Sequence, residues 1–240
     1  MSLLRSIGVL AVSVVGLVLA AHADAGHYDK LDQRLSKLSG QTEIVGLAVA
    51  VIENGEITFA EGYGKPRLDG APVSDDTIFR WASLSKGVAS TAIVKLAQDG
   101  QLALSDKISS FQTSLRLPLG GERVGTLEDL LSHKVGIVPN AYDTRLEDGR
   151  DTADIRRSLG NMHRTCPVGE CHTYQNVAFD AVSEIVSNVR GISFEEFVTT
   201  NLFEPLGMET ASYGMSALKN SDSWAEPHLN LRNRPAPVRR

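Results

Sequence analysis

Two residues whose chemistry can be combined stand at the start of a long apolar helical pattern. Ser83 and Lys86 are three positions apart. Residues i and i+3 share one face of a helix, so the Lys86 amine can reach the Ser83 hydroxyl. A serine hydroxyl is a weak nucleophile that needs an adjacent base, and a lysine supplies one where its surroundings disfavour the charged form. The pair therefore predicts a nucleophile and its proton acceptor.

The spacing alone is a weak signal, because about one chance Ser-x-x-Lys is expected in a chain of this length. A second one runs from Ser216 to Lys219. Ser83 follows a hairpin signal and an extended loop and precedes a helix, whereas Ser216 lies in a polar stretch without periodicity. We interpret Ser216 as a surface residue with no role. The alternative for Lys86 is that it reaches into solvent from an ordinary helix end.

Tyr174 and Asn176 form the second candidate group. They stand on alternate residues of a short segment that follows a turn built from Pro167 and Gly169, so both side chains can point into one cleft. A tyrosine hydroxyl can transfer a proton, and an asparagine amide can hold a substrate amide or orient a lysine. The alternative is that Tyr174 is a half-buried aromatic residue and Asn176 a helix N-cap.

The first 23 residues have the composition of a secretory signal peptide. Arg5 precedes an apolar run over residues 7–21, and residues 21–23 form a small-x-small cleavage site. The run is too short for a transmembrane helix. The sequence thus predicts residues 1–23 as a signal peptide, residues 24–240 as the mature domain without a stable membrane span, and a periplasmic or secreted location.

Charge and composition restrict the partners. Without residues 1–23 the chain carries 23 basic against 29 acidic residues, a net charge of −6. An acidic chain with no basic run has no electrostatic basis for binding nucleic acid. The hydrophobic fraction of 42% suits one globular domain, with or without a small inserted lobe. We expect a monomer that acts on small molecules or cell-wall peptides, without a cofactor.

Cys166 and Cys171 are the only cysteines, and export would place them in an oxidising compartment. A disulfide between them closes a small ring and contributes about 2 kcal/mol at most in the chain-entropy model. With His163 and His172 beside them a metal site is conceivable, but the spacing fits none of the usual zinc patterns. We predict the disulfide, which would stiffen the approach to Tyr174, and no metal.

Periodicity predicts the elements that position these residues. Residues 28–38 should form an amphipathic helix, and residues 44–52 a strand buried on both faces. Asn54-Gly55 predicts a hairpin turn to a partner strand over residues 56–63. The helix that begins near Ser83 should end at Asp99-Gly100 and bury one face, made of Val88, Ala89, Ala92, Ile93, Leu96 and Ala97.

Further helices are expected downstream. Thr126 and Ser193 each begin a capping-box pattern, and a helix over residues 152–162 and another with Val177 on its inner face are predicted. Residues 140–154 should be an exposed polar loop. His133 ends the helix that Thr126 begins; a lone histidine there is more often structural than catalytic, although it could act as an acid or base.

Taken in order, these segments resemble the serine β-lactamase and penicillin-binding-protein superfamily, specifically the class C β-lactamase, D,D-peptidase and esterase branch. The resemblance implies an α+β fold with an antiparallel sheet and packed helices. The segments that carry it are the hairpin around Asn54-Gly55, Thr77-Ile-Phe-Arg-Trp-Ala-Ser-Leu-Ser-Lys86, Leu130-Leu-Ser-His-Lys-Val-Gly-Ile137, Pro167-Val-Gly169, Tyr174-Gln-Asn176, Phe203-Glu-Pro-Leu-Gly-Met208 and Glu226-Pro-His228.

The resemblance assigns a role to each candidate. Ser83 would be the acylated nucleophile, with its backbone N–H as half of an oxyanion hole. Lys86 would accept its proton, Tyr174 would relay protons to and from the leaving group, and Asn176 would bind the substrate amide. The implied activity is acyl-enzyme formation on a β-lactam, a D-Ala-D-Ala-type peptide or an ester, and the chain is expected to bind penicillin.

One motif of that superfamily is missing. Its members carry Lys-Thr-Gly or His-x-Gly on a strand far downstream of the tyrosine motif, and no such triplet follows Tyr174. Lys134-Val-Gly136 precedes Tyr174 and belongs to another matching segment. We therefore expect a chain truncated at its C-terminus that lacks the C-terminal strands. The alternatives are a catalytically impaired fragment or pseudoenzyme, and a Cys/His metal-binding module at residues 163–172.

Overall fold

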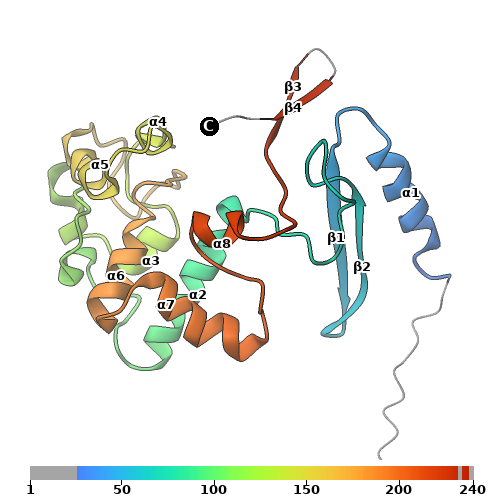
Figure 1. The fold of residues 1–240 in the computed structure, drawn as a ribbon. Helices are drawn as coiled ribbons and strands as arrows, with labels where there is room; N and C mark the ends of the chain where they lie inside the picture. The colour runs from blue at the N-terminus through green and yellow to red at the C-terminus, as the bar shows by residue number, and fades with distance from the viewer. Residues whose placement is uncertain (1–25, 232–233, 238–240) are drawn as a thin grey trace, which may run out of the picture. The chain divides into compact units, whose positions relative to one another are not determined.

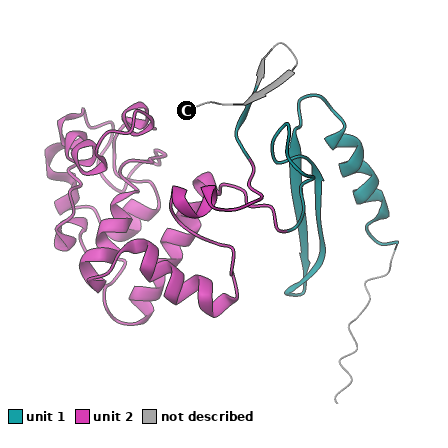
Figure 2. Ribbon diagram, viewed as in Figure 1, with its two compact units in different colours: residues 1–75, 226–240 teal, residues 76–225 magenta. Residues whose placement is uncertain are grey.

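The computed structural model describes residues 26–231 and 234–237, so the predicted signal peptide lies outside the described residues. The chain divides into two compact units: residues 1–75 with 226–240 (unit 1) and residues 76–225 (unit 2) (Figure 2). Over the described residues, the structure has no helix with both the length and the apolar character that crossing a membrane requires.

Unit 1 is built on the predicted hairpin. Strands β1 (Gly46–Glu53) and β2 (Glu56–Gly64) pair antiparallel. Asn54 and Gly55 both have positive φ, 53° and 86°, as a tight two-residue turn requires. The hairpin prediction is confirmed. A second antiparallel pair in this unit joins β3 (His228–Leu231) and β4 (Arg234–Pro237).

Helix α1 (Asp29–Ser39) lies beside the β1–β2 hairpin (Figure 1). The Tyr28 ring, just before the helix, lies 5.2 Å from the Phe59 ring, and its hydroxyl is 2.6 Å from the Thr58 hydroxyl. The Tyr63 hydroxyl donates a hydrogen bond of 2.6 Å to Asp32. Aromatic residues with polar tips thus connect the helix to β2.

The prediction that residues 44–52 are buried on both faces is wrong. Along β1, half-buried Leu47, Val49 and Val51 alternate with exposed residues, and Ile52 is 68% exposed. Among the residues that the structure describes, β1 pairs only with β2. Two strands with one helix beside them leave one face of the sheet to solvent, and successive side chains on a strand point to opposite faces.

Unit 2 is helical and contains the large core. The helices α2 (Ser85–Gln98), α6 (Ala181–Arg190) and α7 (Phe194–Val198) pack on one another. The predicted inner face of α2 is confirmed, because Ala89, Ala92, Ile93 and Leu96 are buried and Val88 and Ala97 pack against the core. The other α-helices of this unit are α3 (Leu127–Leu131), α4 (Asp143–Glu147), α5 (Thr152–Ser158) and α8 (Met215–Lys219).

Helix starts follow the predicted caps with two exceptions. The Thr126 hydroxyl accepts from the Asp129 N–H and the Asp129 carboxylate accepts from the Thr126 N–H, which is a complete capping box. At Ser193 only the bond from the Glu196 N–H to the serine hydroxyl is present. Helix α6 begins at Ala181, later than predicted, because residues 176–180 form turns.

Two further predictions need correction. Residues 140–154 are not simply an exposed loop: they contain α4 and the start of α5, and Ala141 is buried. The polar stretch around Ser216 forms the short helix α8, although Ser216 itself is exposed. Both segments are too short and too polar for a clear 3.6-residue apolar period, so sequence periodicity could not reveal them.

A buried ion-pair network joins α5 to α6. Arg156, whose side chain is 5% exposed, contacts both Asp180 and Glu184 and donates to the Ser114 hydroxyl. Burial raises the pKa of Asp180 despite the Arg156 charge. Burial also acts on Glu184, but hydrogen bonds from Ser114 and the charge of Arg156 hold its pKa below the ordinary value. This network anchors the segment before α6.

The predicted disulfide between Cys166 and Cys171 is present, with the two Cα atoms 6.4 Å apart. Its loop lies against Gly136, where φ is 77° and any Cβ would stand 2.4 Å from the Cys166 carbonyl oxygen. The Gly169 N–H donates to the Lys134 carbonyl at 2.8 Å. The segment with the letters Lys-x-Gly thus supports the disulfide loop.

Candidate active site

The candidate nucleophile lies in a tight turn that opens α2. Ser83 is exposed and belongs to a 3-10 helix, Ala82–Leu84, that leads directly into α2. The backbone N–H groups in the first turn of a helix have no acceptor within the helix, so the N–H of Ser83 can bind a group outside it. The preceding Ala82 has φ of 46°, a left-handed conformation that non-glycine residues rarely adopt. The Ser85 hydroxyl donates to the Ala82 carbonyl and holds this turn.

The structure brings Ser83, Lys86 and Tyr174 together. The Tyr174 hydroxyl donates to Ser83 Oγ at 2.5 Å, although the two residues are 91 positions apart in sequence. Lys86 Nζ donates to Ser83 Oγ at 3.4 Å and lies 4.6 Å from the centre of the Tyr174 ring. The serine oxygen therefore has two groups beside it that can exchange protons.

Asn176 completes the group. Its Oδ1 accepts a hydrogen bond of 2.5 Å from Lys86 Nζ. Lys86 is half-buried and has two partners, so the alternative that it simply reaches into solvent is wrong. The interpretation of Asn176 as a helix N-cap is also wrong, because the N-cap of α6 is Asp180.

His133 supports the segment that carries Tyr174. Its Nδ1 accepts from the Gln175 N–H at 3.2 Å, and its carbonyl accepts from the Thr173 N–H at 2.8 Å. Its ring lies 4.6 Å from the Tyr174 ring and 5.2 Å from the Phe179 ring. These contacts give the histidine a positioning role beneath the tyrosine, in line with the structural interpretation of its sequence context.

Asp143 is a member of this site that sequence reasoning missed. Its Oδ2 accepts a hydrogen bond of 2.7 Å from Asn176 Nδ2. It stands in the acidic stretch over residues 140–154, where several carboxylates occur without a distinguishing pattern. No local signal in the sequence marks it, because its partner is 33 residues away.

The charges of the site shift two titrating groups. Burial raises the pKa of Tyr174, but hydrogen bonds with Lys86 and Ser83 and the Lys86 charge outweigh it, so the pKa is lowered overall; Asp143 opposes this effect. The pKa of His133 is lowered by burial, by the Lys86 charge and by His172. Tyr174 thus loses its proton more readily than an ordinary tyrosine.

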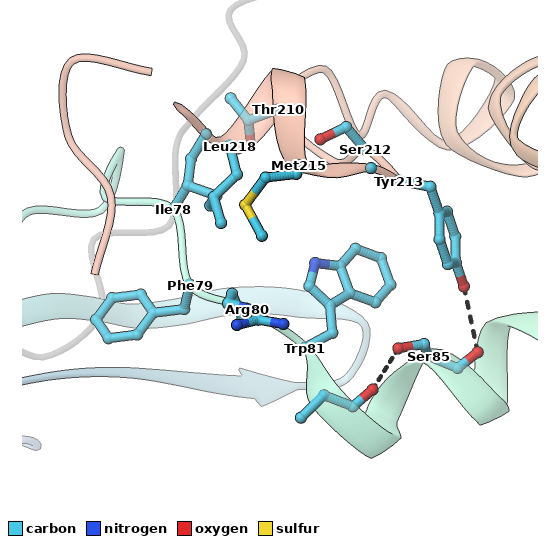
Figure 3. Close-up of a pocket in the computed structure, with 12 residues that line it drawn as sticks. Ile78, Phe79, Arg80, Trp81, Ser85, Thr210, Ser212, Tyr213, Met215 and Leu218 are labelled. Carbon is cyan, nitrogen blue, oxygen red and sulfur yellow. Dashed lines mark hydrogen bonds between the residues drawn. The ribbon is translucent and has the colours of Figure 1, made fainter. Parts of the chain in front are cut away.

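Two pockets of unit 2 border the 3-10 turn. One of about 400 Å³ is lined by Trp81, Tyr213, Met215 and Leu218. In Figure 3, Trp81 faces the α8 side chains, and the Tyr213 hydroxyl bonds to the Ser85 carbonyl at 3.2 Å. Burial raises the pKa of Tyr213 to about 12. The second pocket, of about 390 Å³, is lined by residues that include Ser85, Lys86, Asn176, Phe179 and Asp180.

The alternative of a Cys/His metal module finds no support in this geometry. Cys166 and Cys171 are bonded to each other, so neither offers a free thiolate. Within residues 26–231 and 234–237, there is no group of three or more histidine, cysteine, aspartate or glutamate side chains arranged to hold a metal ion.

The chain is similar in sequence to known proteins. Residues 31–240 match the sequence model of the family described as Beta-lactamase. Protein flp of Staphylococcus aureus (strain COL) is 26% identical over 181 residues, covering 74% of this chain and 36% of that protein. Esterase EstB of Burkholderia gladioli is 28% identical over 245 aligned residues, covering 95% of this chain and 59% of that protein.

Solved structures share the fold. The octameric penicillin-binding protein homologue from Pyrococcus abyssi superposes with a TM-score of 0.77 at 25% identity, over 90% of this chain and 50% of that one. A class C beta-lactamase gives a TM-score of 0.67 at 23% identity, over 88% and 56% of the two chains. The chain thus spans 36% to 59% of the length of these four proteins. The predicted α+β fold, with helices and an antiparallel sheet, is confirmed.

Proposed function

This chain belongs to the beta-lactamase family, and on this basis we propose that it is a serine hydrolase that forms an acyl-enzyme on Ser83. One observation carries the proposal: the Tyr174 hydroxyl lies 2.5 Å, and Lys86 Nζ 3.4 Å, from the Ser83 oxygen. Hydrogen-bond reach between a nucleophile and its proton acceptors is what nucleophilic catalysis requires.

In the proposed reaction Tyr174 carries the proton in both directions, in place of the direct transfer from Ser83 to Lys86 that the family resemblance implies. Tyr174, whose pKa is lowered by Lys86, takes the Ser83 proton as the serine oxygen attacks the substrate carbonyl. The Ser83 N–H stabilises the resulting oxyanion. The phenol then gives this proton to the leaving group as the bond between that group and the acyl carbon breaks. In the second half, a water molecule attacks the acyl carbon and gives a proton to the Tyr174 oxygen. The phenol passes this proton to Ser83 Oγ as the ester bond breaks and the acid product leaves. Lys86 keeps the phenolate accessible, and Asn176 binds the substrate amide.

The substrate class belongs to the same proposal. Candidates are β-lactams, D-Ala-D-Ala-type peptides and esters. Their support is that similar proteins are described as a class C beta-lactamase, a penicillin-binding protein homologue and an esterase. We also propose that the mature protein acts in the periplasm or outside the cell. The predicted signal peptide and the disulfide support this location.

Covalent labelling tests the proposal. A fluorophosphonate and a penicillin should each add one acyl or phosphonyl group to the folded protein, located on Ser83 by mass spectrometry of peptides. Ser83→Ala should remove the adduct. Ser216→Ala is the matched control, since it removes the serine of the exposed second Ser-x-x-Lys and should change nothing.

Absence of any adduct on folded protein would favour the alternative function, a pseudoenzyme or impaired fragment that lacks the third active-site motif. If the protein does take the label, steady hydrolysis of a chromogenic lactam, peptide or ester would show which of the three substrate classes it turns over.

A further inference from the structure

The side-chain amide of Asn176 has an oxygen that accepts hydrogen bonds and a nitrogen that donates them, and the site requires one orientation of this amide. Its Oδ1 faces the Lys86 ammonium at 2.5 Å, and its Nδ2 faces the Asp143 carboxylate at 2.7 Å. An ammonium can only donate and an ionised carboxylate can only accept. A flipped amide would set nitrogen against ammonium and oxygen against carboxylate, and both bonds would be lost.

We propose that Asp143 is a positioning residue of this site: its carboxylate fixes the Asn176 amide so that the carbonyl oxygen faces Lys86. Its other oxygen, Oδ1, is buried and has no hydrogen-bond partner among the described residues. Among the described residues, the Asp143 carboxylate therefore has its side-chain hydrogen bond with Asn176 through Oδ2. Burying the other carboxylate oxygen without a partner costs free energy. Such an arrangement persists where the surrounding structure enforces it.

The backbone enforces it by two unusual conformations. Asn140 and Tyr142, on either side of buried Ala141, have φ of 53° and 62°. Left-handed non-glycine residues store strain and cluster at functional sites. This bend directs the chain into the first residue of α4, which is Asp143.

The same segment is tied to the one that carries the tyrosine. The Asn140 N–H donates to the Tyr174 carbonyl at 2.9 Å, and Gln175 Nε2 donates to the Val138 carbonyl at 2.5 Å. The position of Asp143 is therefore coupled to that of Tyr174 and Asn176.

Asp143 also acts on Tyr174 through its charge. The groups that face the phenol are Lys86 from α2, Asp143 from α4, Ser83 and the ring of His133. Lys86 lowers the pKa of Tyr174, and Asp143 raises it. Neutralising Asp143 therefore lowers the pKa of Tyr174 further, whereas loss of a merely structural contact would not move it in that direction.

The test substitutes Asp143→Asn in the full chain. An asparagine can accept or donate, so it no longer dictates the orientation of Asn176. We expect the Asn176 side-chain amide signals to shift in ¹⁵N NMR, with assignment by their loss in Asn176→Ala. We also expect a lower Tyr174 pKa in ¹³C-tyrosine NMR titrations, assigned with Tyr174→Phe.

Two further variants bracket the result. Asp143→Glu keeps the charge but moves it by one methylene, so the Asn176 signals should shift while the Tyr174 pKa stays near the wild-type value. Asp148→Asn removes an exposed carboxylate at the end of the same helix and should leave both signals unchanged. The rate of Ser83 labelling should fall by up to about 100-fold in Asp143→Asn, the scale of a misplaced catalytic group.

The inference rests on the proposed function only for the labelling rate. Unchanged Asn176 signals and an unchanged Tyr174 titration in folded Asp143→Asn would overturn it, even if wild-type protein labels normally. If the NMR shifts appear but wild-type protein takes no label, the positioning role stands and the proposed function fails.

Discussion

Tyr174 shows how neighbouring side chains change the chemistry of one residue. Free tyrosine keeps its proton at neutral pH, and burial alone would strengthen that tendency. Hydrogen bonds with Lys86 and Ser83, together with the Lys86 charge, outweigh burial and lower the pKa of Tyr174. The lysine thus acts on the serine in two ways, directly at 3.4 Å and through the phenol. We expect this second, electrostatic role to be the larger one, because the phenol is the nearer group to Ser83.

His133 makes the stability of the fold depend on pH. Burial, Lys86 and His172 lower its pKa from the ordinary value of 6.5. In the unfolded chain the ring binds a proton below about pH 6.5, whereas in the folded chain it does so only at lower pH. Between the lowered pKa of the folded state and about pH 6.5, the unfolded state therefore binds more protons than the folded state. The contribution of His133 to stability is present above pH 6.5 and is lost as the pH falls below it.

We predict that His133→Asn flattens this dependence. Asparagine tolerates the left-handed backbone at this position, where φ is 58°, and its oxygen can accept from the Gln175 N–H. Urea unfolding measured at a series of pH values should show wild-type stability declining below about pH 6.5 more steeply than that of the variant. His163→Asn, at an exposed residue away from the aromatic contacts, is the control. Parallel pH profiles for wild type and His133→Asn would contradict the prediction.

Helix α2 is the element on which the site is built. Its first turn carries Lys86, and its later turns fill the core with Ala92, Ile93 and Leu96, all fully buried. Because these residues pack against α6 and α7, the helix cannot shift without opening the core. The exposed serine end thus obtains its rigidity from apolar contacts further along the same helix.

We predict that Ile93→Ala destabilises unit 2 by about 2–5 kcal/mol, through lost burial and the cavity left behind. The matched change is Val94→Ala, the next residue, which is 40% exposed and should alter stability by no more than about 0.5 kcal/mol. Chemical denaturation measures both. Equal losses of stability in Ile93→Ala and Val94→Ala would show that the face of α2 that carries Ile93 is not packed into the core.

At the scale of the whole molecule, the two units differ in their cores. The main cluster of buried apolar residues runs from Ala89 to Phe203, entirely within unit 2. Among the described residues, unit 1 has two two-stranded sheets and helix α1, which has no buried residue, and small two-stranded sheets are marginally stable alone. Ser83, Lys86, Tyr174, Asn176 and Asp143 also lie within unit 2.

We predict that a fragment of residues 76–225 folds by itself. Its denaturant unfolding should be cooperative and its helical circular dichroism should match the structure, because the described core is complete within it. A fragment of residues 26–75 should show no cooperative transition. A broad, non-cooperative transition of residues 76–225 would mean that unit 2 needs the rest of the chain.

The sequence by itself determined the features whose geometry is local. Ser83 and Lys86 share a face because three residues make about one helical turn, the Thr126 capping box follows from a spacing of three, and the Asn54-Gly55 turn follows from two residues that tolerate positive φ. The order of such segments also sufficed for the family resemblance that the match over residues 31–240 bears out.

Only the tertiary structure decided which distant residues meet. Asp143 and Asn176 are 33 positions apart, and Ser83 and Tyr174 are 91 apart. The exposure of β1 and the helix hidden in residues 140–154 depended equally on neighbours. The physical reason is that a turn of helix places residues by covalent geometry alone, whereas the approach of separate segments is set by the packing of the core between them.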